Sequence, residues 1–251
     1  MKINETENAA FSRVCREVVS EGHERYNIGT YKEKKLHLIL KKYFEPDARF
    51  HEVPYGGYIC DVKRDDLITE VQTTGLRTMS RKLAAFLPEC RVRIVFPIIT
   101  EKRIFWVDPA DGTVSEGKKS PKKENGFKLL SEMLYISDYL SDENLTVTAV
   151  YIRADEYRML NGWSRDRKRG SHRFDTIPVQ LRGELILERP EDYMQLVPED
   201  LPEPFTAADF ATAAGIPRAL ASTVMLLLTE TGTVLRVGKQ GRAWLYRLAE
   251  F

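Results

Sequence analysis

Cysteine is scarce in this chain, and its placement argues against both disulfides and zinc. Cys15, Cys60 and Cys90 lie far apart in apolar surroundings, form no CxxC pair and are odd in number. A reducing cytoplasm is therefore the expected location. Long hydrophobic runs are also missing, since none approaches the ~20 residues that span a bilayer. The polar, acidic N-terminus does not read as a signal peptide, so we expect no membrane segment.

An excess of charge of either sign is missing as well. The 38 basic residues balance 37 acidic ones to a net charge of +1, so local clusters are more informative than the sum. The composition, with 43% hydrophobic and 30% charged residues, is ordinary for a soluble globular protein. Nothing in the sequence resembles a P-loop, a Ser-His-Asp triad or a zinc site. The 251 residues suffice for one large domain and one small domain.

The most informative segment reads as a hairpin of two strands that carry acidic residues between apolar ones. A tight turn at Lys63–Asp66 would bring Asp61 beside Glu70, and alternation would place Glu70 and Gln72 on one face. Acidic groups placed together among apolar neighbours are costly unless they are paired or bound to a cation. A divalent metal is the simplest partner, with the Val71 carbonyl as a further oxygen ligand. The alternative is a salt-bridged hairpin in which a nearby Lys or Arg satisfies Asp61.

The elements around this hairpin predict an α/β fold. Strand, helix and strand in succession favour a parallel pair within a mixed sheet flanked by helices. Glu33 has two interpretations, either a capping-box partner of Thr30 or a residue near the metal. His37 and His51 have no partner at metal-ligand spacing and are expected to be ordinary surface or satisfied residues. We predict helices over residues 9–20, 30–44, 78–87 and 127–140, and strands over 51–55, 91–100, 103–107, 145–153 and 176–188.

A family resemblance follows from this order of motifs. A helix with Glu33, a strand–turn–strand with Asp61 and Glu70-x-Gln72, a basic helix and an Ile/Val-rich strand together resemble the PD-(D/E)xK nuclease superfamily. The resemblance covers roughly residues 25–100. It implies a restriction-endonuclease-like sheet.

The resemblance also implies roles for individual residues. Asp61 and Glu70 would bind Mg²⁺, with Mn²⁺ as an alternative ion. The superfamily's lysine corresponds to Gln72, and the proline of its "PD" corresponds to Cys60. Lys82, on the following helix, is expected to substitute for the missing lysine, as migrated lysines do in relatives.

The last part of the chain reads as a separate unit. We place a nuclease-like domain at residues 1–197, a linker at 198–204 (PEDLPEP) and a small domain at 205–251. Thr206 caps a short helix, a longer one follows from Arg218 to Glu230, and two strands surround a basic turn. This order resembles a winged helix, in which the longer helix enters the major groove of DNA. DNA contact is then expected from Arg218, Ser222, Lys239 and Arg242; dimerisation or protein contact is the alternative.

A basic segment from Trp163 to Arg173 suits a phosphate backbone, although such runs are often only solvated loops. Its predicted nucleic-acid ligands are Arg165, Arg167, Lys168 and Arg169. Together the motifs predict a Mg²⁺-dependent endonuclease acting on double-stranded DNA, compatible with a homodimer. The resemblance alone suggests restriction or phage defence. A non-catalytic DNA-binding regulator and an RNA-directed nuclease are the alternatives.

Overall fold

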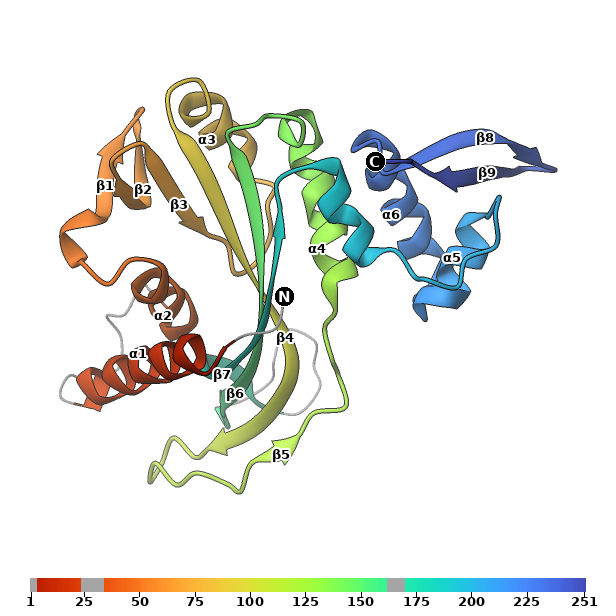
Figure 1. The fold of residues 1–251 in the computed structure, drawn as a ribbon. Coiled ribbons are helices and arrows are strands. Elements are labelled where there is room, and N and C mark those ends of the chain that lie inside the picture. Colours follow the sequence, from red (N-terminus) through yellow and green to blue (C-terminus); the bar gives the residue numbers. More distant parts are fainter. Residues whose placement is uncertain (1–3, 24–33, 162–169) are drawn as a thin grey trace.

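The computed structural model describes residues 4–23, 34–161 and 170–251 (Figure 1). The helices are α1 (Glu5–His23), α2 (Lys35–Phe44), α3 (Met79–Phe86), α4 (Gly126–Met133), α5 (Ala207–Ala214) and α6 (Arg218–Glu230). The 3-10 helices are η1 (Ala48–Phe50), η2 (Leu134–Tyr139) and η3 (Pro190–Leu196). The strands are β1 (His51–Tyr55), β2 (Tyr58–Arg64), β3 (Leu67–Val71), β4 (Arg91–Val107), β5 (Lys118–Lys119), β6 (Leu145–Met159), β7 (His172–Leu187), β8 (Val234–Gln240) and β9 (Ala243–Leu248).

Seven of these strands form one mixed sheet. Its order is β1-β2-β3-β4-β6-β7, with β5 paired to β4 outside this path. Strands β3, β4 and β6 run parallel, and the pairs toward both edges are antiparallel. The helix α3 crosses from β3 to its parallel neighbour β4, as such a connection requires. The expectation of an α/β fold with a mixed, helix-flanked sheet is confirmed.

Helices cover both faces of this sheet (Figure 1). Strand β4 explains why two layers form, because its central residues are apolar on both sides. Ile94 and Phe96 point into the core beneath α3 and α4. Val95, between them, points into the second core beneath α1 and α2. The two cores thus hold the sheet between helical layers.

Several boundaries differ from the sequence-based expectation. The predicted strands 91–100 and 103–107 are one strand, because β4 passes an irregularity between Ile99 and Glu101 without leaving its partner β6. The predicted helix 127–140 ends at Met133 and continues as η2, where Ile136 is non-helical (φ −126°). The helix α2 begins at Lys35 after an extended Lys34, so the predicted start at residue 30 is wrong. Thr30 lies outside the described residues.

The C-terminal unit consists of α5, α6 and the β8–β9 hairpin. Gly215 ends α5 in the left-handed conformation (φ 63°), which glycine adopts without strain. Helix α6 packs against α4, and Phe210 meets Phe127 edge-to-face at 5.8 Å between ring centroids. The buried residues of the C-terminal unit belong to the same core as those beneath α3 and α4. Within the described part of the chain, no single helix is long and apolar enough to cross a membrane, although α5 and α6, bent by 112°, meet that criterion as a pair.

Candidate active site

The candidate site lies where strands β2 and β3 part. The ladder between them runs from Arg64↔Leu67 at the turn to Val62↔Thr69. One position further, Asp61 would stand opposite Glu70. The Asp61 carboxylate turns between the strands instead, and its Oδ2 accepts a hydrogen bond from the Val71 backbone N–H at 2.8 Å. A side-chain oxygen thus replaces a backbone carbonyl as acceptor, and we call this opening the strand fork.

Glu70 is the most deeply buried member of the strand fork. Its side chain is fully inaccessible to solvent, and its Oε2 accepts a hydrogen bond from Lys82 Nζ at 2.7 Å. The other oxygen, Oε1, is buried without a hydrogen-bond partner in the described structure. Lys82, on α3, also donates to the Ile59 carbonyl at 3.0 Å, which fixes its ammonium above β2. A buried carboxyl oxygen left without a partner is unfavourable, so it marks a position where a ligand would be stabilising.

The two carboxyl groups have pKa values displaced in opposite directions. Burial, followed by the negative charge of Asp61, raises the pKa of Glu70 to about 7, although Lys82 and, more weakly, the nearby backbone N–H of Asp61 oppose this. Burial would likewise raise the pKa of Asp61, but hydrogen bonds from His37 and Val71 and the charge of Lys82 hold it below its ordinary value. Such opposed values in one site are typical of catalytic or metal-binding carboxyl pairs.

His37 joins the strand fork from the other side of the sheet. It projects from α2, and its Nε2 lies 3.1 Å from the same Asp61 Oδ2 that Val71 binds. His37 is thus a satisfied histidine, one of the two outcomes expected for it, and its partner is a predicted metal ligand.

The four remaining predicted site residues differ in what the structure shows of them. Lys82 reaches Glu70, and its role as a substitute lysine stays a prediction. Gln72 follows the end of β3, where its backbone N–H donates to the Val95 carbonyl at 2.9 Å and its side chain is half-buried. Glu33 lies outside the described residues. Val71 contributes its N–H to the site, and metal binding by its carbonyl stays a prediction.

The predicted nucleic-acid ligands lie elsewhere. The described ones are exposed on the C-terminal unit, at the start of α6 and on the β8–β9 hairpin: Arg218, Ser222, Lys239 and Arg242. The others fall in a segment outside the described residues: Arg165, Arg167, Lys168 and Arg169. None of the exposed four contributes to the strand fork.

The donor set can be tested against a divalent cation. Carboxylate oxygens are the ligands Mg²⁺ prefers, and it binds through one or two of them while keeping several waters. Asp61 and Glu70 supply such a pair, with the unpartnered Oε1 of Glu70 as one ligand atom. No group of three or more His, Cys, Asp or Glu side chains suited to a metal occurs among the residues with described positions. Two carboxylates are the ligand type such an ion takes, and a metal at the strand fork stays a prediction.

Comparison with known proteins places this chain in a family. Residues 34–188 match the model of a family described as a domain of unknown function, DUF8091. The chain belongs to the DUF8091 family. A protein of Treponema pallidum (strain Nichols), described as uncharacterized, is 32% identical over 228 residues, which cover 88% of this chain and 87% of the relative. No solved structure matches the chain significantly.

The DUF8091 segment contains all the described residues of the strand fork. His37, Asp61, Glu70 and Lys82 lie within it, whereas α1 and the C-terminal unit lie outside. The strand fork thus lies within the segment of this chain that matches the family.

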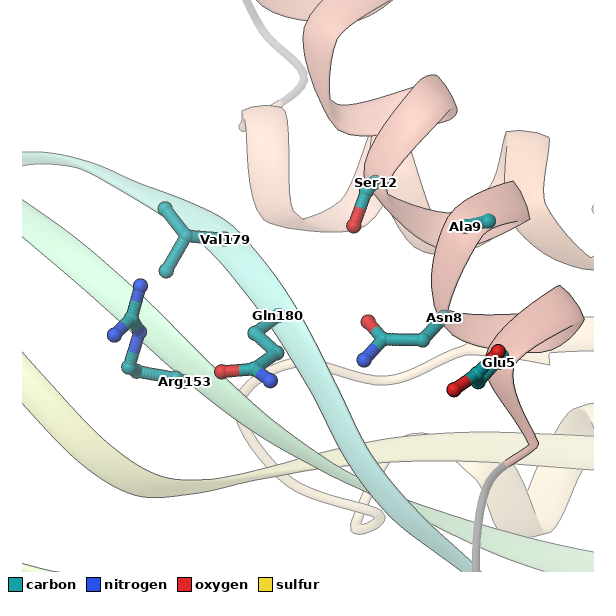
Figure 2. A pocket seen from close by; sticks show the side chains of 7 residues that line it. All are labelled: Glu5, Asn8, Ala9, Ser12, Arg153, Val179 and Gln180. Carbon is teal, nitrogen blue, oxygen red and sulfur yellow. The ribbon is translucent and has the colours of Figure 1, made fainter.

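Away from the strand fork, a hollow of about 330 Å³ lies between α1 and strands β6 and β7 (Figure 2). Gln180 and Asn8 point toward one another across it, and Arg153 lies beside them. The Arg153 Nε and Asn8 Oδ1 atoms are likewise buried without a hydrogen-bond partner in the described structure. The hollow offers no set of metal ligands or opposed carboxyl groups. The strand fork remains the better candidate for chemistry.

Proposed function

We propose that this protein is a divalent-metal-dependent nuclease that hydrolyses phosphodiester bonds of DNA at the strand fork. The observation that carries the proposal is Glu70, a fully buried carboxyl group with one unpartnered oxygen beside a second carboxylate. A restriction-endonuclease-like core, with Mg²⁺ or Mn²⁺ as the ion, would account for this arrangement.

Each side chain of the strand fork would have a separate role in phosphodiester hydrolysis. Asp61 and Glu70 would hold the ion, which when bound neutralises charge at phosphorus and lowers the pKa of the attacking water. His37 and the Val71 N–H fix the orientation of the Asp61 carboxylate. Lys82, beside Glu70, would donate to a phosphate oxygen or orient the water. Gln72 would assist at the mouth of the site, and Glu33 would approach from before α2.

The partner we propose is double-stranded DNA. The C-terminal unit would act as a winged helix, with Arg218 and Ser222 of α6 against the bases and Lys239 and Arg242 of the hairpin against phosphates. The basic segment with Arg165, Arg167, Lys168 and Arg169 would add phosphate contacts. A pseudo-symmetric DNA target would suit a homodimer, and restriction or phage defence would be the setting.

The first experiment measures cleavage by the full chain with Mg²⁺ or Mn²⁺ on duplex DNA, single-stranded DNA and RNA. We expect duplex cleavage that Asp61→Asn and Glu70→Gln each reduce on the order of a hundredfold or more. Asp111→Asn removes a carboxylate from an exposed loop and serves as the matched control. Full activity in both strand-fork variants would refute the proposal, and cleavage of RNA alone would redirect it to an RNA-directed nuclease.

A second readout is independent of turnover. A cation that binds only the folded protein raises its melting temperature. Mg²⁺ or Mn²⁺ should therefore stabilise the wild type and the Asp111→Asn control but not Asp61→Asn. Equal stabilisation of all three proteins would place the ion elsewhere.

One observation favours a second function. The ion pair between Lys82 and Glu70 already neutralises part of the buried charge, as in a salt-bridged hairpin. A non-catalytic DNA-binding regulator could use the same scaffold. It would bind DNA without cleavage under every metal tested, and its melting temperature would not respond to the ions.

A further inference from the structure

The β8–β9 hairpin has a one-sided charge. It has no Asp or Glu between Val234 and Leu248. Its cations are Arg236, Lys239, Arg242 and Arg247. In Figure 1 its strands extend past α5 and α6 into open space, and most of its residues are exposed on both faces. A hairpin of this kind buries little of its own surface, so its side chains are available to a partner.

An indole ring lies within this positive charge. Trp244 is 40% exposed, which is unusual for so large an apolar side chain. Lys239 is its direct cross-strand partner, with Nζ 4.4 Å from the centroid of the indole. The Arg236 guanidinium lies 5.0 Å from the same centroid. These two cations hold the indole in place on the hairpin while leaving it accessible.

We infer that Trp244, together with Arg236 and Lys239, forms a stacking platform for an unpaired base of a nucleic acid strand. A single strand presents flat bases next to anionic phosphates. The indole would take a base, and the two cations that now face the ring would turn to the flanking phosphates. Stacking on aromatic rings beside basic groups is the general chemistry of single-strand recognition.

Other partners fit this surface less well. A closed duplex offers phosphates to the cations, but its stacked bases leave the indole without a partner. A membrane would favour a hairpin with apolar residues at its tip, whereas the tip here is Gln240, Gly241 and Arg242. The exposed Leu235 and Val237 lie back along β8. An acidic peptide would satisfy the cations but not the ring.

This platform deepens the proposed function, on which it rests for the nature of the partner. It shares no residue with the strand fork, and the two lie at opposite ends of the molecule in Figure 1. The hairpin would bind a frayed end, gap or junction, while the strand fork acts on another stretch of the same polymer. Binding and cleavage can therefore be tested separately.

The test measures binding by the full chain in EDTA, where no cleavage occurs. The probes are a fluorescent oligothymidylate and a duplex of the same length. We expect Trp244→Ala to weaken single-strand binding by about 5- to 150-fold, which corresponds to ~1–3 kcal/mol of stacking per base. The loss on the duplex should be smaller, and Trp244→Phe should retain most of the single-strand affinity.

The controls separate stacking from charge and from general damage. Phe251→Ala removes another exposed aromatic ring outside the hairpin and should change neither affinity. Lys239→Ala should reduce the salt dependence of binding, unlike Arg13→Ala on α1. Unchanged single-strand affinity of Trp244→Ala, or equal loss on both probes, would overturn the platform. A third probe is a vesicle that contains anionic phosphatidylserine. A protein that binds neither nucleic acid probe, whether or not it binds these vesicles, would also overturn the stacking platform. Cleavage by a protein that fails here would leave the nuclease proposal standing.

Discussion

The carboxyl group of Glu70 is fully buried near Asp61, and this burial lowers the stability of the folded protein by an amount that depends on pH. Its pKa of about 7 lies above the ordinary value of 4.5. Between these values the folded protein retains a proton that the unfolded chain has lost. Stability must therefore fall as pH rises through this window, and it stays lower above it.

This pH dependence can be measured in EDTA. The wild type should lose up to about 3 kcal/mol of unfolding free energy through Glu70 between about pH 4.5 and pH 7.5. Glu70→Gln, which is neutral throughout, should lose less and should be the more stable protein at the upper end. Urea denaturation at a series of pH values measures both. Parallel pH profiles for the two proteins would show that Glu70 titrates normally.

His37 gives a second prediction at this scale. Because it holds the Asp61 carboxylate, His37→Ala should weaken Mg²⁺ or Mn²⁺ binding by about 10- to 100-fold, as is typical for groups that orient a metal ligand. His37→Gln, which keeps a donor, should restore part of the affinity. Calorimetric titration of the metal gives the measurement. His172→Ala, at an exposed histidine hydrogen-bonded to Asn161, is the control; an equal loss there would argue against a positioning role.

The sequence could predict some of these residues and not others. Asp61 and Glu70 lie on neighbouring strands because a tight turn brings β2 back beside β3, and this turn is a local property of the sequence. His37 could not be placed in the same way. Its contact depends on how α2 packs across the end of β3, which local periodicity does not contain.

At the scale of the element, the start of α5 follows from its sequence. Thr206 Oγ1 accepts from the Asp209 N–H at 3.3 Å, and Asp209 Oδ2 accepts from the Thr206 N–H at 2.8 Å. The predicted Thr206 cap is confirmed. Thr206→Ala should lower the unfolding free energy by about 1 kcal/mol, measured by urea denaturation. Thr206→Ser keeps the oxygen and should cost less; equal losses would show that the methyl group, not the cap, matters.

Elements whose limits depend on neighbours were harder to predict. β4 continues past Ile99 because β6 stays paired beside it, whereas the polar residues 100–102 by themselves indicate a break. The early start predicted for α2 rested on a capping pattern at Thr30, but Lys34 is extended. Local signals thus located the elements, and tertiary pairing set their limits.

At the scale of the whole molecule, composition predicted a linker at residues 198–204 and two domains. That division stays a prediction. Composition does not report that α6 packs on α4, or that Phe210 and Phe127 share one core with the sheet. Such packing arises between segments nearly a hundred residues apart, beyond the reach of any local pattern.

The shared core predicts one cooperative unfolding transition for the whole chain. Phe210→Ala, at a fully buried ring, should lower the unfolding free energy by about 3–5 kcal/mol and should shift the entire transition. Calorimetry with both fluorescence and circular dichroism probes would follow it. Phe251→Ala, at an exposed ring, should leave the transition unchanged. Two separate transitions, only one of them moved by Phe210→Ala, would instead establish independent domains.

The packing of α6 on α4 bears on where a strand would be cut. The C-terminal unit shares a hydrophobic core with the sheet and is not joined to it by a flexible linker alone. The distance between the hairpin and the strand fork is therefore fixed by packing. If the hairpin binds the unpaired end of a nucleic acid, the distance between that end and the carboxylates of the strand fork would be constant. The scissile position would then be counted from a structural discontinuity in the polymer, whatever the intervening base sequence.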